Sequence, residues 1–238
     1  MEHEHSRSAI ADRLARAPTV SYLRDWVYGG IDGAVTTFAV VAGVVGAELT
    51  NRVVLILGAA NLVADGFSMA ASNYSGTKTE HEELAQLRAV EERHIDTVPE
   101  GEREEIRQIF RAKGFEGRDL EQAVAVITGD RARWVDTMLA EEYGLPKTVR
   151  APLKAAASTF AAFLLCGTIP LLPFLAPTAR QFEQSVAVTA LVFFLIGSTK
   201  SRWSPVSWWR SGAETLLIGL GAAALAYLVG ALLRSVVV

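Results

Sequence analysis

Two apolar segments near the start of the chain carry acidic side chains where a simple membrane anchor would carry leucine. The first segment, residues 27–49, contains Asp32 near its beginning. The second segment, residues 53–75, contains polar residues that follow the spacing of one helical face: Asn61, Asp65, Ser68, Met69 and Ser72. A carboxylate in hydrocarbon costs roughly 2.5–3.5 kcal/mol even on a lenient insertion scale. Acids inside these segments therefore indicate a pathway for ions or protons.

The polar face of the second segment offers a mixed set of metal ligands. Carboxylate and amide oxygens suit Mn²⁺ and Fe²⁺, while the thioether of Met69 favours a softer ion and disfavours Mg²⁺ and Ca²⁺. The alternative is that Met69 packs in the interior and the polar residues join helices to one another. An unpaired acid such as Asp32 is harder to explain by packing. We therefore predict four metal-binding residues in the membrane: Asp32, Asn61, Asp65 and Met69.

Further potential ligands occur as pairs in the charged region between residues 76 and 148. Each pair has the i, i+3 or i, i+4 spacing that places two side chains on one face of a helix. The pairs are Glu91 with His94, Glu102 with Glu105, and Met138 with Glu142. A glutamate and a histidine three residues apart commonly hold a first-row metal. A solvated helix face is the alternative for any one pair, but three pairs in one short region favour a metal site.

These residues must be positioned by membrane-spanning helices and by a polar helical region between them. A spanning helix needs roughly 18 or more mostly apolar residues. Five segments qualify: residues 27–49, 53–75, 151–175, 182–199 and 212–233. The first is not a signal peptide, because no basic region precedes it and no cleavage site follows. We predict an all-α membrane protein with five transmembrane helices and a three-helix cytoplasmic metal-binding domain between helices 2 and 3.

The predicted domains follow from the change in charge density along the chain. They are a cytoplasmic N-terminal arm (1–24), transmembrane helices 1 and 2 (25–76), the metal-binding helical domain (77–148) and transmembrane helices 3 to 5 (149–238). Within the metal-binding domain, the second span continues to about residue 94. Thr97 is then a candidate cap for a helix that has Pro99 in its first turn. Glycines and prolines delimit helices over residues 100–113, 117–128 and 131–143.

Lysine and arginine residues near the ends of the spans predict the orientation. One side of the membrane carries many of them: Arg7, Arg13, Arg16, Arg24, Lys78, Arg88, Lys147, Arg150, Lys154, Lys200, Arg202 and Arg210. The other side carries only Arg52, Arg180 and Arg234. The N-terminus and the charged region are therefore predicted to be cytoplasmic and the C-terminus outside. An interfacial aromatic belt fits the cytoplasmic side: Trp203, Trp208 and Trp209.

Composition excludes several other classes of protein. The formal net charge of −3 gives no basic field for nucleic acid. The single cysteine, Cys166, excludes a disulfide framework and a cysteine-based zinc site. The scattered histidines and the absence of a His-Glu-x-x-His motif argue against a metalloenzyme. We interpret His3 and His5 as part of a disordered tail.

Several separate motifs resemble the vacuolar iron transporter family. Residues 31–38 (IDGAVTTF) and 64–70 (ADGFSMA) are similar to the first and second helices of that family. Residues 91–99 (EERHIDTVP) and 134–145 (WVDTMLAEEYGL) are similar to its cytoplasmic metal-binding domain. The resemblance extends over about residues 20–238, in order and with similar spacing.

The resemblance implies a homodimer with five membrane helices per protomer and an ion path at the dimer interface, between the first two helices of each subunit. It implies that Fe²⁺, and often Mn²⁺, leaves the cytosol in exchange for protons. The ligands of the family correspond to seven residues here: Asp32, Met69, Glu91, Glu102, Glu105, Met138 and Glu142.

This chain departs from the pattern of the family at three positions. Asn61, His94 and Leu139 each stand where the family has a glutamate. Asp65, one helical turn from Asn61, is the candidate replacement for the lost carboxylate. The added imidazole suits Fe, Zn, Ni and Cu better than Mn. We therefore expect Fe²⁺ or Mn²⁺ as the transported ion, with Zn²⁺ as an alternative at the cytoplasmic site, and no prosthetic group.

Three functions fit the residues: a proton-coupled divalent metal transporter, a metal-sensing membrane scaffold and a membrane metalloenzyme. An acid inside the first helix favours the transporter, and no enzyme activity is expected. Cytoplasmic ligands would pass the ion to the membrane residues, whose carboxylates hold metal and protons in turn. Glu214 is a further candidate for the proton path, although pairing with Arg210 is favoured. The expected location is a bacterial plasma membrane.

Overall fold

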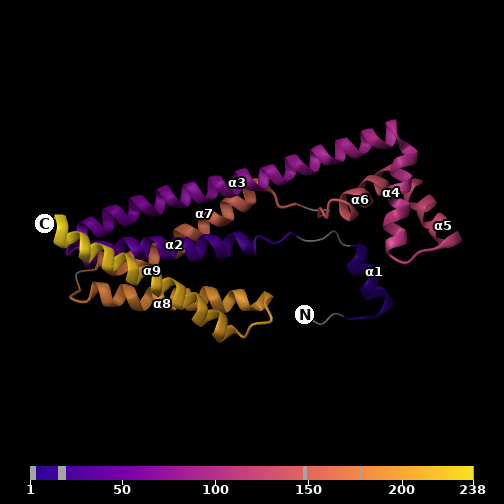
Figure 1. Cartoon of the computed structure of the whole chain (residues 1–238). Helices are drawn as coiled ribbons and strands as arrows, with labels where there is room; N and C mark the ends of the chain where they lie inside the picture. The colour runs from indigo at the N-terminus through magenta and orange to yellow at the C-terminus, as the bar shows by residue number, and fades with distance from the viewer. Residues whose placement is uncertain (1–3, 16–19, 147–148, 177, 238) are drawn as a thin grey trace. The chain divides into compact units, whose positions relative to one another are not determined.

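The computed structural model of the protein describes residues 4–15, 20–146, 149–176 and 178–237. Within those ranges every regular element is a helix. The chain divides into two compact units, a polar unit (residues 1–20 and 77–150) and a membrane unit (residues 21–76 and 151–238). Three residues named above lie outside the described ranges: His3, Arg16 and Lys147. Helix α3 (Asn51–Thr97) belongs to both units, because it runs on without interruption past Gly76 (Figure 1).

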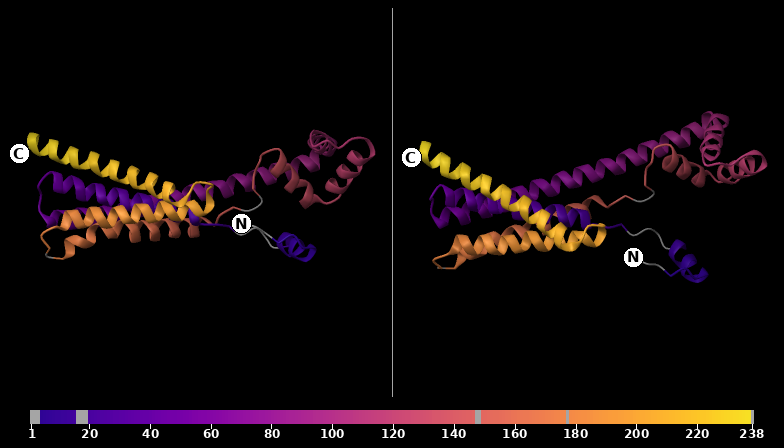
Figure 2. Two further views of the ribbon diagram at one scale, coloured as in Figure 1. Left: turned by 90° about the horizontal axis from the view of Figure 1, so that it is seen from below. Right: turned by 60° about the horizontal axis from the view of Figure 1, so that its bottom comes forward.

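Five helices of the described chain are long and apolar enough to cross a membrane, which confirms the predicted number of spans. They are α2 (Leu23–Gly46), the first part of α3, α7 (Pro152–Thr168) with the 3₁₀ helix η1 (Ile169–Leu175), α8 (Gln181–Lys200) with the 3₁₀ helix η2 (Ser201–Trp203), and α9 (Trp208–Val237). Figure 2 shows α8 and α9 alongside α2 in two views. Pro170 and Pro173 explain why α7 gives way to a 3₁₀ helix, since proline removes a backbone donor.

Helix α2 packs against α7 at very short range because glycines face it. A Cβ atom built on Gly33 would lie 2.4 Å from the carbonyl oxygen of Phe163. One built on Gly29 would lie 2.2 Å from the carbonyl oxygen of Thr159. Small residues at such positions let two backbones approach closely in a membrane. The buried side chains of Phe38, Val41 and other residues of the core then fill the space around α2.

Substitution of Gly33 tests this close approach. Gly33→Val should destabilise the protein by more than about 3 kcal/mol, because overpacking already costs 1–3 kcal/mol where only side chains must yield and here the obstacle is backbone. Thermal unfolding and gel filtration of the purified protein in detergent measure the effect. Gly221→Val on α9 is the matched control, since a Cβ at Gly221 has open space. An unfolding temperature for Gly33→Val equal to that of the control would contradict the packing.

The polar unit contains α1 (Arg7–Ala15), the end of α3, α4 (Pro99–Ala112), α5 (Gly117–Thr128) and α6 (Arg131–Glu141). The last three helices occupy the predicted positions. Their buried faces share one apolar cluster: Ile95, Ile106, Leu120, Val124, Trp134, Val135, Met138 and Leu139. Gly114 ends its helix with φ of +92°, in the left-handed region that favours glycine.

The prediction that Thr97 caps α4 is wrong. Val98 occupies the N-cap position, and no side chain there accepts a hydrogen bond from the helix. The hydroxyl of Thr97 instead donates to the carbonyl oxygen of Arg93, at 2.9 Å, on the last turn of α3. Such a bond to the residue four positions earlier competes with capping. Pro99 begins α4 as expected, because the first helical position needs no backbone donor.

Candidate metal site

Three potential ligands converge where α3 ends and α4 begins. Glu91 and His94 lie on one face at the end of α3, and Glu102 lies one turn into α4. The direct turn at Val98 brings Glu102 back toward the other two residues. One ligand atom from each of the three lies within 4.8 Å of the others. The Nδ1 atom of His94 lies 3.3 Å from Oε1 of Glu102. The structure thus joins two of the pairs seen in the sequence into one cluster.

The two carboxylates of this cluster are buried and incompletely paired. Glu91 is 1% exposed and Glu102 is 4% exposed. In each, the Oε2 atom has no hydrogen-bond partner among the described residues. The hydroxyl of Tyr143 donates to Oε1 of Glu91 at 2.9 Å and so orients that carboxylate. Buried carboxylate oxygens without donors are costly, and a divalent cation would satisfy both.

Two further carboxylates, Glu105 and Glu142, stand next to the cluster. Both line an open hollow of about 470 Å³ between α4 and the end of α6, with Glu104 and Gln108 also in its wall. Burial, followed by the negative charges of Glu105, Glu91 and Glu142, raises the pKa of Glu102 to about 7. Burial, followed by the charges of Glu105 and Glu91, also raises the pKa of Glu142. The site therefore gathers more negative charge than it can hold without a proton or a cation.

The acids in the membrane unit form a second group. Asp32 on α2 and Asp65 on α3 lie close enough for their charges to repel each other. The amide nitrogen of Asn61 is buried and meets no acceptor in the part of the chain that the structure describes. Met69 is half-buried and Asp65 is exposed in the single chain. The sequence predicts that these four residues bind the metal ion in the membrane, and this role stays a prediction.

Comparison with known proteins assigns this arrangement to a family. The sequence model of the VIT family matches residues 23–231. The chain belongs to the VIT family. It is 33% identical to vacuolar iron transporter 1 of Arabidopsis thaliana over 86% of this chain and 83% of that protein. It is 32% identical to the vacuolar iron transporter of Toxoplasma gondii over 91% of this chain and 76% of that protein.

A third VIT relative covers almost the whole chain. Vacuolar iron transporter 1 of Tulipa gesneriana is 31% identical over 99% of this chain and 93% of its own length. The match confirms the resemblance that the motifs indicated. Since members of the VIT family are transporters, it also confirms that the chain is not an enzyme.

Met138 and Leu139 differ in environment from the other candidate positions of this VIT protein. Met138 is 0% exposed and lies in the apolar cluster with Ile106 and Trp134. Leu139, where a glutamate was expected from the family, is 4% exposed in the same cluster. The structure therefore gives Met138 a packing role, and its role as a ligand stays a prediction.

Sequence reasoning missed two sets of polar contacts in the fold. One is the Tyr143 hydroxyl at Glu91, adjacent to the predicted ligand Glu142. The other is a buried polar group at the start of α2. There the amide of Asn73 donates to Oδ1 of Asp25 at 2.9 Å and to the hydroxyl of Thr159 at 2.7 Å. The sequence signal for this contact was an acid, Asp25, at the start of the first span and an amide, Asn73, near the end of the second.

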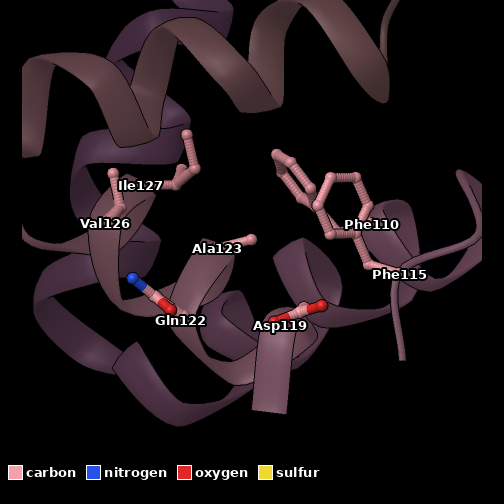
Figure 3. Close-up of a pocket in the computed structure, with 7 residues that line it drawn as sticks. All are labelled: Phe110, Phe115, Asp119, Gln122, Ala123, Val126 and Ile127. Atoms are coloured by element: carbon pink, nitrogen blue, oxygen red, sulfur yellow. The ribbon is translucent and has the colours of Figure 1, made fainter. Parts of the chain in front are cut away.

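Another hollow of the polar unit lacks the chemistry of a metal site. Figure 3 shows the rings of Phe110 and Phe115 on one side of it and Val126 and Ile127 on the other. Asp119 is the one carboxylate in its described lining. A single carboxylate beside aromatic and aliphatic groups does not hold a divalent cation, so the hollow is separate from the candidate site.

The imidazole at position 94 should set the metal preference of the site. His94→Glu should change the ratio of Fe²⁺ to Mn²⁺ affinity by about tenfold in favour of Mn²⁺, because carboxylate suits Mn²⁺ and imidazole suits Fe²⁺ and Zn²⁺. Anaerobic titration of the full-length protein with each ion measures the ratio. His5→Glu adds the same charge in the N-terminal arm and serves as the control. An unchanged ranking of metals in His94→Glu would show that the imidazole is not a ligand.

Proposed function

We propose that this VIT protein is a proton-coupled transporter that moves Fe²⁺, and also Mn²⁺, out of the cytosol. One observation carries the proposal: Glu91, His94 and Glu102 place ligand atoms within 4.8 Å of one another, next to two more carboxylates, in a chain with five spanning helices. Iron as the cargo is supported by the names of the relatives, which are vacuolar iron transporters.

The proposed route runs from the polar unit to the membrane unit. The cluster around Glu102 collects the ion, which then passes to Met69, Asn61 and Asp65 on α3 and on to Asp32 on α2. Support comes from the proximity of Asp32 and Asp65, which lie within electrostatic range of each other, since two neighbouring acids in a membrane call for a shared cation or proton. The buried, unpartnered amide of Asn61 lies on the same helix as Asp65.

Proton coupling is supported by the acid–base state of Glu102. Its pKa of about 7 means that the carboxyl exchanges a proton near neutral pH. Metal and proton compete for the same oxygen lone pairs, so that metal binding releases a proton. A carboxyl of ordinary pKa would carry no proton to release at that pH. The same competition at Asp32 and Asp65 would couple the two flows across the membrane.

A homodimer is supported by the exposed face of α3. Asp65 is exposed on the protomer within a spanning helix, and an acid facing lipid costs roughly 2.5–3.5 kcal/mol. Large apolar residues on α3 are exposed as well: Ile56 at 67%, Val63 at 59% and Phe67 at 69%. A second copy that covers Asp65 would remove this cost. We further propose that the N-terminus and the polar unit face the cytosol, in a bacterial plasma membrane.

Uptake into vesicles tests the function. The full-length protein in vesicles with an acidic lumen and a lumenal pH dye should accumulate Fe²⁺ and release protons from the lumen, while empty vesicles do neither. Collapse of the pH gradient with an ionophore should slow the uptake. The same assay with Mn²⁺ and Zn²⁺ ranks the cargo ions. Metal binding without accumulation would replace the transporter by a metal-sensing scaffold, and accumulation that ignores the gradient would remove the coupling to protons.

A further inference from the structure

A pocket of the membrane unit combines an apolar groove with a cationic mouth. It lies between the first two turns of α2 and the end of α8 with η2, and its volume is about 420 Å³. Leu23, Val27 and Ile31 line it at intervals of four residues, which places them in one row along α2. This row rises by roughly 12 Å, close to the roughly 15 Å depth of one hydrocarbon leaflet.

Two cations stand in the wall of this α2–α8 pocket, and no acid lines it among the described residues. Arg24 lies at the start of α2 and Lys200 at the end of α8. Neither side chain forms an ion pair with a residue that the structure describes. The guanidinium of Arg24 lies over the ring of Tyr28, 5.4 Å from its centroid, which fixes its position.

Uncharged groups complete the mouth of the pocket. The hydroxyl oxygen of Ser204 accepts a bond from the backbone nitrogen of Val206 at 3.3 Å, so its own proton is left to donate. Trp203 and Tyr28, each 55% exposed, have the amphipathic rings that favour the level of lipid headgroups. The first-turn N–H groups of α2 add positive partial charge beside Arg24.

We propose that the α2–α8 pocket binds an anionic phospholipid. The phosphate lies between Arg24, Lys200 and Ser204, and one acyl chain follows the row Leu23–Val27–Ile31. Basic pockets between spanning helices recognise anionic headgroups in this way. Charge selects the headgroup, since two cations with no acid in the described lining of the pocket favour a net negative lipid over a zwitterionic one. The apolar row selects a lipid over free phosphate.

Native mass spectrometry of the full-length protein tests this pocket. The protein in detergent is mixed with phosphatidylglycerol or phosphatidylcholine of the same acyl chains. The wild type should retain phosphatidylglycerol about thirtyfold more strongly, and Arg24→Gln/Lys200→Gln should lose that preference, because each of the two cations near a lipid surface contributes about 1 kcal/mol and about 1.4 kcal/mol is a tenfold change. Arg202→Gln/Arg210→Gln removes the same charge from η2 and the start of α9, at residues that do not line the pocket, and it should keep the preference. Equal loss in both double variants would mean general surface charge and would overturn the proposal.

A third variant tests the acyl groove. Val27→Trp fills the apolar row while both cations remain, and it should also reduce the retention of phosphatidylglycerol about tenfold. Retention at the wild-type level would overturn the groove as the acyl site. Inorganic phosphate and glycerol phosphate at millimolar concentration should fail to displace the lipid. Displacement by either would show a phosphate site without lipid recognition and would likewise overturn the proposal. If Val27→Trp does not fold, the two double variants, which change exposed side chains, still decide the question.

Discussion

Asp32→Asn is expected to reduce metal uptake into vesicles to the level of empty vesicles while the protein stays folded. The amide keeps the shape of the side chain and loses the charge. Without the charge, the group neither binds a divalent cation strongly nor exchanges a proton. Uptake of Fe²⁺ against an imposed pH gradient gives the rate, and gel filtration with thermal unfolding reports on the fold.

Glu48→Gln is the control for this prediction, because it removes a carboxylate from the segment after the other end of α2. Glu48 is exposed and forms an ion pair with Arg234, away from Asp32. Its loss should leave uptake within about twofold, since exposed ion pairs contribute little. Transport by Asp32→Asn at the wild-type rate would remove Asp32 from the ion path. A neighbouring carboxylate, Asp65, would then become the candidate for the same step.

The helices of this protein could be predicted because their signals are local. Apolar segments of spanning length gave the five membrane helices, and glycines with Pro99 gave the bounds of α4, α5 and α6. The pair Glu91 and His94 could be placed on one face from spacing alone. These features depend on residues within a few turns of one another, so they can be predicted from the local sequence.

Other features of the site could not be predicted because they depend on tertiary contacts. Helical spacing says nothing about whether Glu102 on α4 faces Glu91 on α3, which depends on the turn at Val98. The bond from Tyr143 to Glu91 joins residues 52 positions apart. Spacing also paired Met138 with Glu142, yet the structure turns Met138 into the apolar cluster.

Thr97 and Asp25 show two further limits of sequence reasoning. The hydroxyl of a threonine just before a helix can accept a bond from the first turn of that helix or donate to a carbonyl oxygen of the preceding turn. Here Thr97 donates to the carbonyl oxygen of Arg93. Asp25 stands just before the apolar run and reads as an ordinary interfacial acid. Only the fold shows that it is 2% exposed and bonded by Asn73. Burial of a polar group is a property of the packed helices rather than of the segment that carries it.

Glu102→Gln is expected to raise the stability of the metal-free protein at pH 8 and to abolish stabilisation by metal. The pKa of Glu102 in the folded protein is about 7, against an ordinary value of 4.5. As pH rises from about 4.5 to 7, the unfolded chain loses this proton while the folded chain keeps it, so stability falls. Above pH 7 the buried charge costs the folded state on the order of 3 kcal/mol. The neutral amide avoids that cost, and the gain should vanish at pH 4.

In the wild type, bound metal turns the destabilising charge of ionised Glu102 into a stabilising contact. Mn²⁺ satisfies the ionised carboxylate, so it should raise the unfolding temperature strongly at pH 8 and weakly at pH 5.5, where protons occupy the site. Glu102→Gln should respond to Mn²⁺ at neither pH. Glu104→Gln is the control. The hydrogen bond with Arg107 lowers the pKa of Glu104, so the ionised carboxylate of Glu104 stabilises the folded state above its ordinary pKa. Glu104→Gln should therefore lower stability at pH 8, while the response to Mn²⁺ remains. A Glu102→Gln protein that is less stable than the wild type without metal at pH 8, or that still responds to Mn²⁺, would show that Glu102 is an ordinary buried acid rather than the centre of the metal site.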